Sequence, residues 1–434
     1  MKIAIIGTGY VGLVSGACFS EFGFEVTCVD NDPDKIASIV AGDMPIFEPG
    51  LADLVGRNAS AGRLHFTTDL KNAVAAADAV FIAVGTPKRR GDGHADLSFV
   101  YAVAREVAFC LNGYTVVITK STVPVGTGRK VAKIIATTNP NAAFDVASNP
   151  EFLREGAAIA DFMRPNRVVV GAETDAAREV LRALYRPLYL IETPILFTSL
   201  ETSELIKYAS NAFLAVKISY INQMADLCEA VGADVHGVAK GMGLDKRIGA
   251  KFLHPGPGYG GSCFPKDTRA LVKTAEDHHQ TMSIVESAMA YNEARKTAMA
   301  QRVIAAMGGE VGGRRIAILG LAFKPETDDM RDSPSLDIIP SLLASGAEVV
   351  AYDPKSMGEA KVRLPKAVKY EQSALACIAD ADAVVVITEW NEFRALSAEQ
   401  FVDSMSGTTM IDLRNLYQPD KMLAAGISYF SIGR

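Results

Sequence analysis

One stretch of the chain combines a possible nucleophile with glycines and charged groups. Residues 256–267 read Gly-Pro-Gly-Tyr-Gly-Gly-Ser-Cys-Phe-Pro-Lys-Asp. The repeated glycines indicate a backbone that another group approaches closely. Because Pro265 can serve as the first residue of a helix, Cys263 is expected just ahead of a helix N-terminus, where the dipole and Lys266 favour a thiolate. With Asp267 as an acid/base partner, this pattern indicates nucleophilic catalysis; the alternative is a buried structural cysteine.

Other polar residues have a spacing or a position that suits a site. Lys207 and Asn211 are four residues apart in a predicted helix and so share a face, where they could bind an oxyanion or a hydroxyl. From spacing alone, a solvated helix face is the better interpretation. Residues 120–124 (Lys-Ser-Thr-Val-Pro) and 149–156 (Asn-Pro-Glu-Phe-Leu-Arg-Glu-Gly) follow predicted strands, at the edge where open α/β sheets bind ligands. Helix capping is the alternative there.

A glycine motif near the N-terminus predicts a dinucleotide site. Residues 7–12 read Gly-Thr-Gly-Tyr-Val-Gly, between an apolar strand and an apolar helical pattern. Asp30 ends the next strand, where a carboxylate binds a ribose 2′-hydroxyl and repels a 2′-phosphate, so NAD is favoured over NADP. Lys35, in the next turn, could contact the adenosine side. The alternative for the glycine motif is a turn that binds no ligand. Thr86 lies in the turn 85–87 after a predicted strand, where cofactor contacts are expected. The alternative for this turn is an ordinary strand end.

The elements around these residues predict an α/β fold. Apolar runs at 3–6, 26–29, 79–84, 115–119 and 144–147 are typical of buried parallel strands, with a further strand at 168–170. Amphipathic stretches between them indicate βαβ units. Residues from about 199 to 231 contain no Gly or Pro and predict one long helix. Such a helix could link two domains or form a dimer interface.

The end of the chain repeats the order of its beginning. Residues 315–320 resemble 2–7, residues 347–354 resemble 24–30, and residues 381–386 resemble 77–82. We therefore predict two Rossmann-like, doubly wound parallel-sheet domains joined by a central helical domain, with bounds 1–198, 199–300 and 301–434. The second copy has Gly-Leu-Ala-Phe at 320–323 in place of the glycine motif, so it is expected to bind something other than a dinucleotide pyrophosphate. Its polar loop 323–333 carries Lys324 and Arg331, although a solvated loop is the alternative.

Composition excludes several classes of protein. The 434 residues are 49% hydrophobic and 22% charged with a net charge of −6, which argues against nucleic acid or a membrane as the main partner. No apolar run approaches the roughly 18 residues of a spanning helix, and no secretory leader is recognisable. The six cysteines include no Cys-x-x-Cys pair, so a metal site is not expected. Scattered cysteines of this kind indicate that the protein is found in a reducing cytoplasm.

Taken together, the motifs resemble those of the UDP-glucose/GDP-mannose dehydrogenase family over the whole length. They are GTGYVG, KSTVPVGT, NPEFLREG, ETSELIKYASNAFLA, GPGYGGSCFPKD and FKPETDDMRDSPS. The resemblance implies a four-electron oxidation of a nucleotide sugar, with UDP-glucose the expected substrate and two NAD as acceptors. A cysteine thiohemiacetal becomes a thioester, which water hydrolyses to a carboxylate.

The resemblance also implies roles for individual residues. It assigns Cys263 as nucleophile, Lys207 to the oxyanion, Asp267 to acid/base work through water, and Thr122, Asn211 and Glu151 to the water and to thioester hydrolysis. The residues implied at NAD are Gly7, Gly9, Tyr10, Val11, Gly12, Asp30, Lys35, Thr86, Thr122, Glu155, Lys266 and Arg331. Those implied at the sugar nucleotide are Glu151, Phe152, Leu153, Arg154, Glu155, Lys207, Asn211, Phe252, Leu253, His254, Pro255, Gly256, Gly260 and Lys324. Arg247 is implied to reach the sugar across a homodimer interface.

Three alternatives stay open at this point. The same chemistry could act on GDP-mannose or a UDP-N-acetylhexosamine. A two-electron 3-hydroxyacid-type dehydrogenase would share the first domain and the long helix but would not need Cys263. A non-catalytic NAD-binding scaffold would lose no activity on Cys263→Ser.

Overall fold

The chain folds into two compact units, each built on a mostly or wholly parallel sheet. The computed structural model describes residues 1–87, 89 and 94–434. One unit holds Met1–Ser210 with Lys273–His279, and the other holds Asn211–Val272 with Gln280–Arg434. Because the boundary falls within two helices, the predicted division at residues 198 and 300 stays a prediction.

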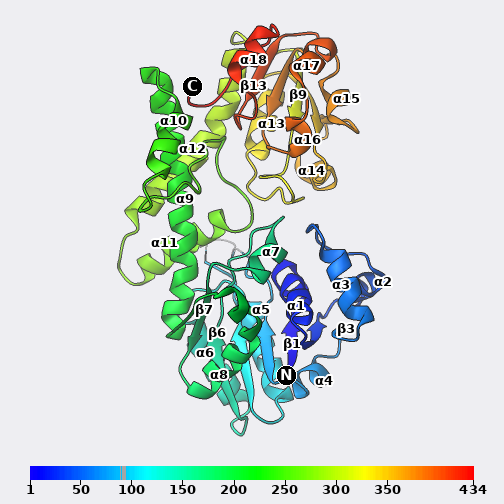
Figure 1. Cartoon of the computed structure of the whole chain (residues 1–434), viewed down its shortest axis with the longest axis vertical. Helices are drawn as coiled ribbons and strands as arrows, with labels where there is room; N and C mark the ends of the chain where they lie inside the picture. Colours follow the sequence, from blue (N-terminus) through cyan, green and yellow to red (C-terminus); the bar gives the residue numbers. More distant parts are fainter. Residues whose placement is uncertain (88, 90–93) are drawn as a thin grey trace. The chain divides into compact units, whose positions relative to one another are not determined.

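The strands of the first unit lie in the part of the chain coloured blue to green in Figure 1. They form one sheet of eight strands. Their order is β3-β2-β1-β4-β5-β6-β7-β8, and all neighbours are parallel except β6 and β7. The bounds are β1 (Lys2–Ile6), β2 (Glu25–Val29), β3 (Leu64–Thr67), β4 (Ala79–Ile82), β5 (Thr115–Thr119), β6 (Phe144–Ser148), β7 (Val168–Ala172) and β8 (Ile195–Thr198). The six predicted strands are present, whereas the sequence reading missed β3 and β8. Both are edge strands with partly exposed residues, so neither is a continuous apolar run.

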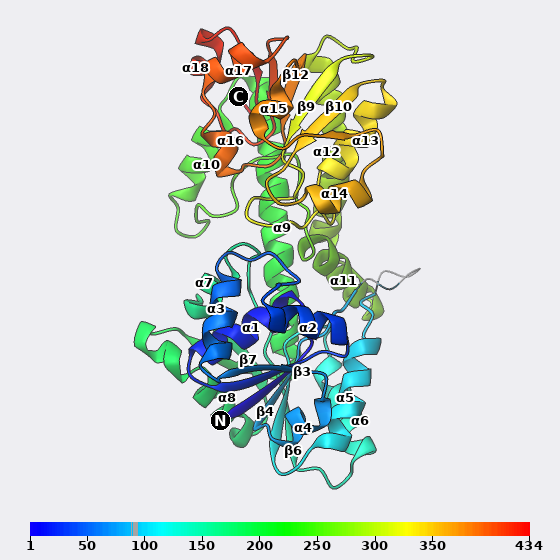
Figure 2. The ribbon, with the colours of Figure 1, turned by 90° about the vertical axis from the view of Figure 1, so that its right-hand side faces the viewer.

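Helices cover both faces of this sheet because its side chains alternate between two cores. Ile3 and Ile5 of β1 pack in one core with Leu13 and Phe19 of α1, and Ala4 and Ile6 pack in another with residues of α5 and α6. Figure 2 shows α5 and α6 together on one side of the sheet. The helices are α1 (Tyr10–Glu21), α2 (Pro33–Ala41), α3 (Leu51–Ser60), α4 (Leu70–Ala75), α5 (Ser98–Cys110), α6 (Thr127–Thr138), α7 (Ala158–Met163), α8 (Asp175–Leu184) and the 3₁₀ turn η1 (Arg186–Ile191).

The predicted long helix is confirmed as α9 (Leu200–Val231). Three further helices lie between the two sheets in the sequence: α10 (Val235–Gly243), α11 (Phe264–Asp277) and α12 (Ser283–Ala306). Residues of α9 and α12, among them Ile221 and Val303, pack in the core of the second unit. No helix among the described residues is long and apolar enough to cross a membrane.

The sheet of the second unit is parallel throughout and repeats the strand order of the first. Its order is β11-β10-β9-β12-β13-β14. The strands are β9 (Arg315–Leu319), β10 (Glu348–Tyr352), β11 (Lys369–Tyr370), β12 (Ala383–Val386), β13 (Thr409–Asp412) and β14 (Ser428–Phe430). The helices are α13 (Ser335–Ala344), α14 (Met357–Arg363), α15 (Ala374–Ile378), α16 (Asn391–Arg394), α17 (Ala398–Ser404) and α18 (Pro419–Ala424). The predicted fold class is thereby confirmed, with β7 and β8 the two strands that run opposite to the other strands of the first sheet.

Candidate active site

The glycine turn of the first unit contains one glycine that its own packing does not require. A Cβ on Gly7 would lie 2.7 Å from the carbonyl oxygen of Ala83, and a Cβ on Gly12 would lie 1.9 Å from that of Gly7. A Cβ on Gly9 would meet nothing within 4 Å, and its φ of −72° suits any residue. Glycine at position 9 therefore leaves room for a ligand, as the close approach of a pyrophosphate requires.

The helix that follows the turn presents its N-terminus to the same place. Gly9 is the N-cap of α1, no side chain caps it, and the first turn holds no acidic residue. Backbone N–H groups at a helix N-terminus attract phosphate. The room at Gly9 and the uncapped helix N-terminus thus fit the pyrophosphate of a dinucleotide.

Asp30 lies directly after β2 and beside the glycine turn. Its Oδ2 accepts from Thr8 N at 2.9 Å, from the Thr8 hydroxyl at 2.7 Å and from Lys35 Nζ at 2.8 Å. Burial alone would raise its pKa, but these bonds outweigh burial and lower the pKa to about 2. Among the hydrogen bonds of the described residues, Oδ1 accepts one, from Asp32 N at 3.3 Å, so it keeps capacity for a ribose hydroxyl.

Two candidate residues meet where β4 and β5 end. The hydroxyl of Thr86 donates to the carbonyl oxygen of Thr122 at 3.0 Å. The neighbouring Ser121 hydroxyl donates to Val84 O at 2.6 Å. The two strand-end turns are therefore joined at the carboxyl edge of the sheet, the edge that also carries the glycine turn.

A buried ion pair joins the segment after β6 to the long helix. Lys207 Nζ of α9 lies 3.3 Å from Glu151 Oε1, and the two side chains are 3% and 7% exposed. The ring of Phe152 lies 5.3 Å from Lys207 Nζ and 3.6 Å from the guanidinium carbon of Arg167. Lys207 is thus not part of a solvated helix face, which was the better interpretation from spacing alone.

Beneath this pair lies a second buried lysine that sequence reasoning did not single out. Lys120 Nζ donates to Asn149 Oδ1 at 2.9 Å and to the Tyr185 hydroxyl at 3.0 Å. Burial lowers the pKa of Lys120 to about 8, in spite of the nearby Glu151 carboxylate. Lys120 and Asn149 directly follow β5 and β6, so their bond fixes the two strand ends that carry Thr122 and Glu151.

In the second unit, Cys263 directly precedes α11, as predicted. Its carbonyl oxygen accepts the first helical hydrogen bond, from Asp267 N at 2.8 Å. Cys263 and Cys110 are partly exposed, whereas the other four cysteines are buried. Burial raises the pKa of Cys18, Cys28 and Cys377 to about 12, which keeps them as thiols. The setting of Cys263, at a helix N-terminus and open to a reactant, is the one that favours a nucleophile.

Asp267 lies one helical turn after Cys263 and is held by two candidate residues. Asn211 Nδ2 of α9 donates to its Oδ2 at 2.6 Å, and Lys266 Nζ donates to its Oδ1 at 2.8 Å. The Asp267 side chain is 1% exposed. Residues four apart share a helix face, so the carboxylate, the amide and the sulfur converge on the first turn of α11.

The glycines before Cys263 are required by the protein itself. A Cβ on Gly260 would lie 2.3 Å from the carbonyl oxygen of Asp332, and one on Gly261 would lie 2.6 Å from the Phe323 ring. Gly261 N also donates to Arg331 O at 2.6 Å. The predicted close approach is therefore made by the loop 320–334 of the same unit, and not by a ligand alone.

Two helices hold the same glycine segment from its other side. Asn292 of α12 accepts from Tyr259 N at 2.8 Å and donates to Tyr259 O at 3.1 Å. Asn222 of α9 accepts from Gly256 N at 2.8 Å, and Arg295 of α12 donates to Gly256 O at 2.7 Å. Sequence reasoning missed these three buried residues, although a polar residue in the apolar stripe of a helix is the signal that could have found them.

The remaining candidates of the second unit differ in exposure. Leu253, Pro255 and Gly256 are buried, Phe252 and Lys324 are partly buried, and His254, Arg247 and Arg331 are exposed. Arg247 pairs with Asp245 and Arg331 with Asp329, two local ion pairs. Arg414, which sequence reasoning missed, follows β13 and donates to Phe323 O at 2.9 Å and to Ile387 O at 2.7 Å. It adds a cation to the carboxyl edge of this sheet.

The structure therefore assembles the candidates into two groups, each within one unit. The first contains the glycine turn, Asp30, Lys35, Thr86, Thr122, the segment Glu151–Glu155 and Lys207. The second contains Asn211, the segment Phe252–Gly260, Cys263, Lys266, Asp267, Lys324 and Arg331. In the first group, Leu153 N donates to the Glu151 carboxylate, Arg154 pairs with Asp161 at 2.6 Å, and Glu155 is partly buried.

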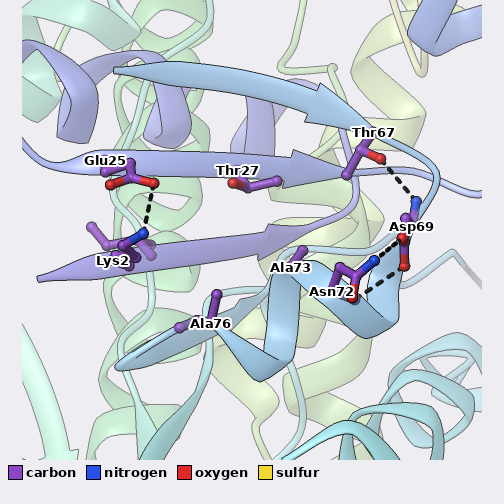
Figure 3. Close-up of a pocket in the computed structure, with 10 residues that line it drawn as sticks. Lys2, Glu25, Thr27, Thr67, Asp69, Asn72, Ala73 and Ala76 are labelled. Carbon is purple, nitrogen blue, oxygen red and sulfur yellow. Dashed lines mark hydrogen bonds and ion pairs between the residues drawn. The ribbon is translucent and has the colours of Figure 1, made fainter. Parts of the chain in front are cut away.

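A hollow on the face of β1, β2 and β3 lies apart from the first group (Figure 3). Its volume is about 240 Å³, and none of the candidate residues lines it. Lys2 pairs with Glu25 at 3.1 Å, and Asp69 accepts from Asn72 N at 3.0 Å, so its polar groups bond to one another (Figure 3). Nothing about this hollow suggests a reaction.

Comparison with known proteins agrees with the resemblance seen in the motifs. Three models of the UDP-glucose/GDP-mannose dehydrogenase family match: the NAD binding domain at residues 1–189, the central domain at 201–294 and the UDP binding domain at 317–419. UDP-glucose 6-dehydrogenase of Rhizobium meliloti (strain 1021) is 59% identical over 100% of both chains.

Solved structures agree as well. A UDP-glucose dehydrogenase from Pyrobaculum islandicum superposes with a TM-score of 0.90 at 38% identity, covering 99% of this chain and 96% of that one. A UDP-D-ManNAc dehydrogenase from Pyrococcus horikoshii superposes with a TM-score of 0.86 at 28% identity, covering 100% and 99%. With a matched NAD binding domain and a glycine turn that fits the coenzyme, this is an NAD-dependent oxidoreductase fold, and the chain belongs to the UDP-glucose/GDP-mannose dehydrogenase family.

Proposed function

We propose that this protein is a UDP-glucose 6-dehydrogenase, which converts UDP-glucose, two NAD and water into UDP-glucuronate and two NADH. The proposal is supported by the full-length similarity to the Rhizobium meliloti enzyme of that name. The observation that carries it is Cys263 at the N-terminus of α11, one turn from a buried Asp267 that Asn211 and Lys266 hold in place.

The first oxidation converts the C6 alcohol to an aldehyde. It removes a hydride from C6 and a proton from the hydroxyl group; bound NAD supplies the hydride acceptor here and in the second oxidation. Lys207, a buried cation paired with Glu151, stabilises the negative charge that develops on the C6 oxygen. Asp267 takes the proton through a water, which Asn211 and Thr122 orient.

The second oxidation requires the aldehyde to be held covalently. Cys263 Sγ adds to C6 to form a thiohemiacetal, whose C6–H bond then gives up the second hydride and leaves a thioester. Water attacks the thioester, the C6–S bond breaks, and the thiolate and the carboxylate are released. Glu151 assists this hydrolysis, and the helix N-terminus at Cys263 stabilises the departing thiolate.

Each ligand draws on residues of both groups. Gly7, Gly9, Tyr10, Val11, Gly12, Asp30, Lys35, Thr86, Glu155, Lys266 and Arg331 bind the coenzyme. Phe152, Leu153, Arg154, Phe252, Leu253, His254, Pro255, Gly256 and Gly260 surround the sugar nucleotide, and Lys324 neutralises its pyrophosphate. The roles rest on the family motifs and on the chemistry of each side chain.

A substrate panel tests the proposal. Purified enzyme with NAD is given UDP-glucose, GDP-mannose or a UDP-N-acetylhexosamine at equal concentration, and NADH formation is followed by absorbance. UDP-glucose is expected to be turned over at least tenfold more efficiently than the others. Preference for an N-acetylhexosamine would favour the second candidate, which the Pyrococcus horikoshii structure represents at 28% identity.

A homodimer or a higher homo-oligomer is part of the proposal. Phe213, Tyr220 and Leu227 of α9 are 66%, 47% and 51% exposed and recur every seven residues, which places them along one helix face. An exposed apolar stripe of this kind is typical of a helix that pairs with another. Sedimentation of the wild type at twice the chain mass, and of Phe213→Ser at a lower mass, is expected. The cytoplasmic location inferred from the cysteines stays a prediction.

A further inference from the structure

Glu48 is a buried carboxylate that none of the proposed roles uses. It lies between α2 and α3 and is 6% exposed. Its Oε1 accepts from Ala158 N at 2.7 Å, and its Oε2 accepts from Gly156 N at 2.7 Å and from the Tyr10 hydroxyl. Among the ion pairs of the described residues none involves Glu48. The carboxylate is therefore bonded to two backbone groups and one phenol, which belong to two separate segments.

The first of these segments is the coenzyme turn. Tyr10 is the first residue of α1 and directly follows Gly9. Burial, with the carboxylates of Glu48 and Glu155, holds the pKa of the Tyr10 phenol above its ordinary value, so it donates to Glu48 as a neutral hydroxyl. A displacement of the first turn of α1 is thereby transmitted to the carboxylate.

The second segment begins α7 and directly follows Glu151–Glu155. Ala157 is the N-cap of α7 and has no side chain that could cap it, so the Glu48 carboxylate takes that role at Ala158 N. The body of α7 packs on α1, where Phe162 and Phe19 meet edge to face with their ring centroids 5.0 Å apart. Glu48 is a polar connection between the N-terminal ends of these two helices, through Tyr10 and Ala158.

We propose that Glu48 is a positioning residue which couples the coenzyme turn to the segment Glu151–Ala158, so that NAD and UDP-glucose strengthen each other's binding. The inference rests on the proposed function where it assigns Glu151–Glu155 to the sugar. Ordering either segment orders Glu48, and a second ligand then meets a segment already in place. Such coupling is reciprocal, so it is measurable from either ligand.

The experiment is a titration of the full-length enzyme with NADH, followed by NADH fluorescence, in the absence and presence of saturating UDP-glucose. NADH replaces NAD because the pair cannot turn over. The ratio of the two dissociation constants measures the coupling. We expect UDP-glucose to tighten NADH binding about fivefold or more in the wild type. In Tyr10→Phe, which removes the phenol bond to Glu48 and keeps both backbone bonds to that carboxylate, the ratio is expected to fall to about one.

Glu48→Gln is the second variant. Its amide keeps one acceptor oxygen, so one of the two backbone N–H groups, of Gly156 or Ala158, must face an amide donor. The ratio is expected to fall here too. Tyr114→Phe is the matched control, because it removes a phenol bond of 2.7 Å to a different carboxylate, Asp145, at an exposed place in the same unit.

A ratio of one in the wild type, or a wild-type ratio retained in Tyr10→Phe, would overturn the coupling. Loss of the ratio in Tyr114→Phe as well would also overturn it, because the effect would then be general. Should Glu48→Gln fail to fold, Tyr10→Phe decides alone. Turnover of UDP-glucose by the wild type is measured in parallel, so a failure of the coupling is distinguished from a failure of the proposed function.

Discussion

The two Rossmann-like regions share a strand order but differ at the turn after their first strand. In the first, residues 7–9 lead directly from β1 into α1, and in the second, residues 320–334 separate β9 from α13. Both turns begin with a glycine of positive φ, +102° at Gly7 and +93° at Gly320, and neither glycine has room for a Cβ. The first turn thus presents a helix N-terminus, whereas the second presents a polar loop with Lys324 and Arg331.

The aspartates that follow the second strand of each region make the difference plainer. Asp30 keeps an oxygen with one long bond at 3.3 Å. Asp353 is fully buried, and both its oxygens are filled by Leu321 N, Ala322 N, Trp390 Nε1, Lys355 N and Ser356 N at 2.7–3.1 Å. An aspartate at the same place in one topology therefore either keeps an oxygen open to a ligand or organises its own loop, and the number of internal donors decides which.

The largest expected effect is on Asp353. Asp353→Ala leaves five donors, four of them buried, without this acceptor and is expected to lower the free energy of unfolding of the second unit by about 4 kcal/mol. Thermal unfolding followed by calorimetry measures the loss, and NADH affinity is expected to be retained. If NADH binding weakened while the unfolding temperature stayed unchanged, Asp353 would be a ligand-binding residue. The proposed difference between Asp30 and Asp353 would then be wrong.

Gly9→Ala separates binding from stability in the first region. The added Cβ meets nothing in the chain, so the unfolding temperature is expected to stay the same, while NADH affinity falls roughly a hundredfold, or about 2.7 kcal/mol. Gly56→Ala of α3, which also meets nothing, is the control and is expected to leave NADH affinity unchanged. Normal coenzyme binding by Gly9→Ala would place the pyrophosphate elsewhere.

Asn292→Ala tests the two hydrogen bonds by which α12 holds the segment before Cys263. It leaves Tyr259 N and O, both in a buried residue, without their side-chain partner. A looser segment is expected to lower kcat about tenfold with little change in NADH affinity. Steady-state kinetics beside NADH titration checks both. An unchanged kcat would mean that α12 does not position the cysteine.

Glu204 is expected to make the stability of the protein depend on pH. Burial raises its pKa to about 7 although Gly126 N and Gly128 N donate to it. A carboxyl group with a raised pKa in the folded state binds more protons there, so stability is expected to fall as pH rises from about 5 to about 7, by at most about 1.4 kcal/mol for each pH unit. Thermal unfolding at several pH values should show this slope in the wild type and a flatter one in Glu204→Gln.

Local patterns in the sequence predicted the fold and much of the site. The glycine turn, the repeated strand order and the helix of 199–231 follow from periodicity and from glycine and proline positions, which act over short distances. The position of Cys263 ahead of α11 was predicted on the same basis. These features need no knowledge of which segments lie side by side.

Contacts between distant segments could not be predicted in this way. Glu48 bonds to residues more than a hundred positions away, and Asn292 is a partner of Tyr259 only after α12 has packed. The close approach to Gly260 and Gly261 was predicted, but its cause, the loop 320–334, was not. Spacing alone also favoured a solvent-exposed position for Lys207, because nothing in the local sequence indicates the buried Glu151 beside it.

The proposed role of Cys263 as nucleophile is best tested by counting NADH formed for each UDP-glucose consumed, in the wild type and in Cys263→Ser. Two NADH are expected for the wild type, with UDP-glucuronate as the product. For Cys263→Ser, with no sulfur to form the thioester, we expect the second oxidation or the hydrolysis to stall and uronate formation to fall by orders of magnitude. Two NADH per sugar at an undiminished rate in Cys263→Ser would contradict the role of this sulfur.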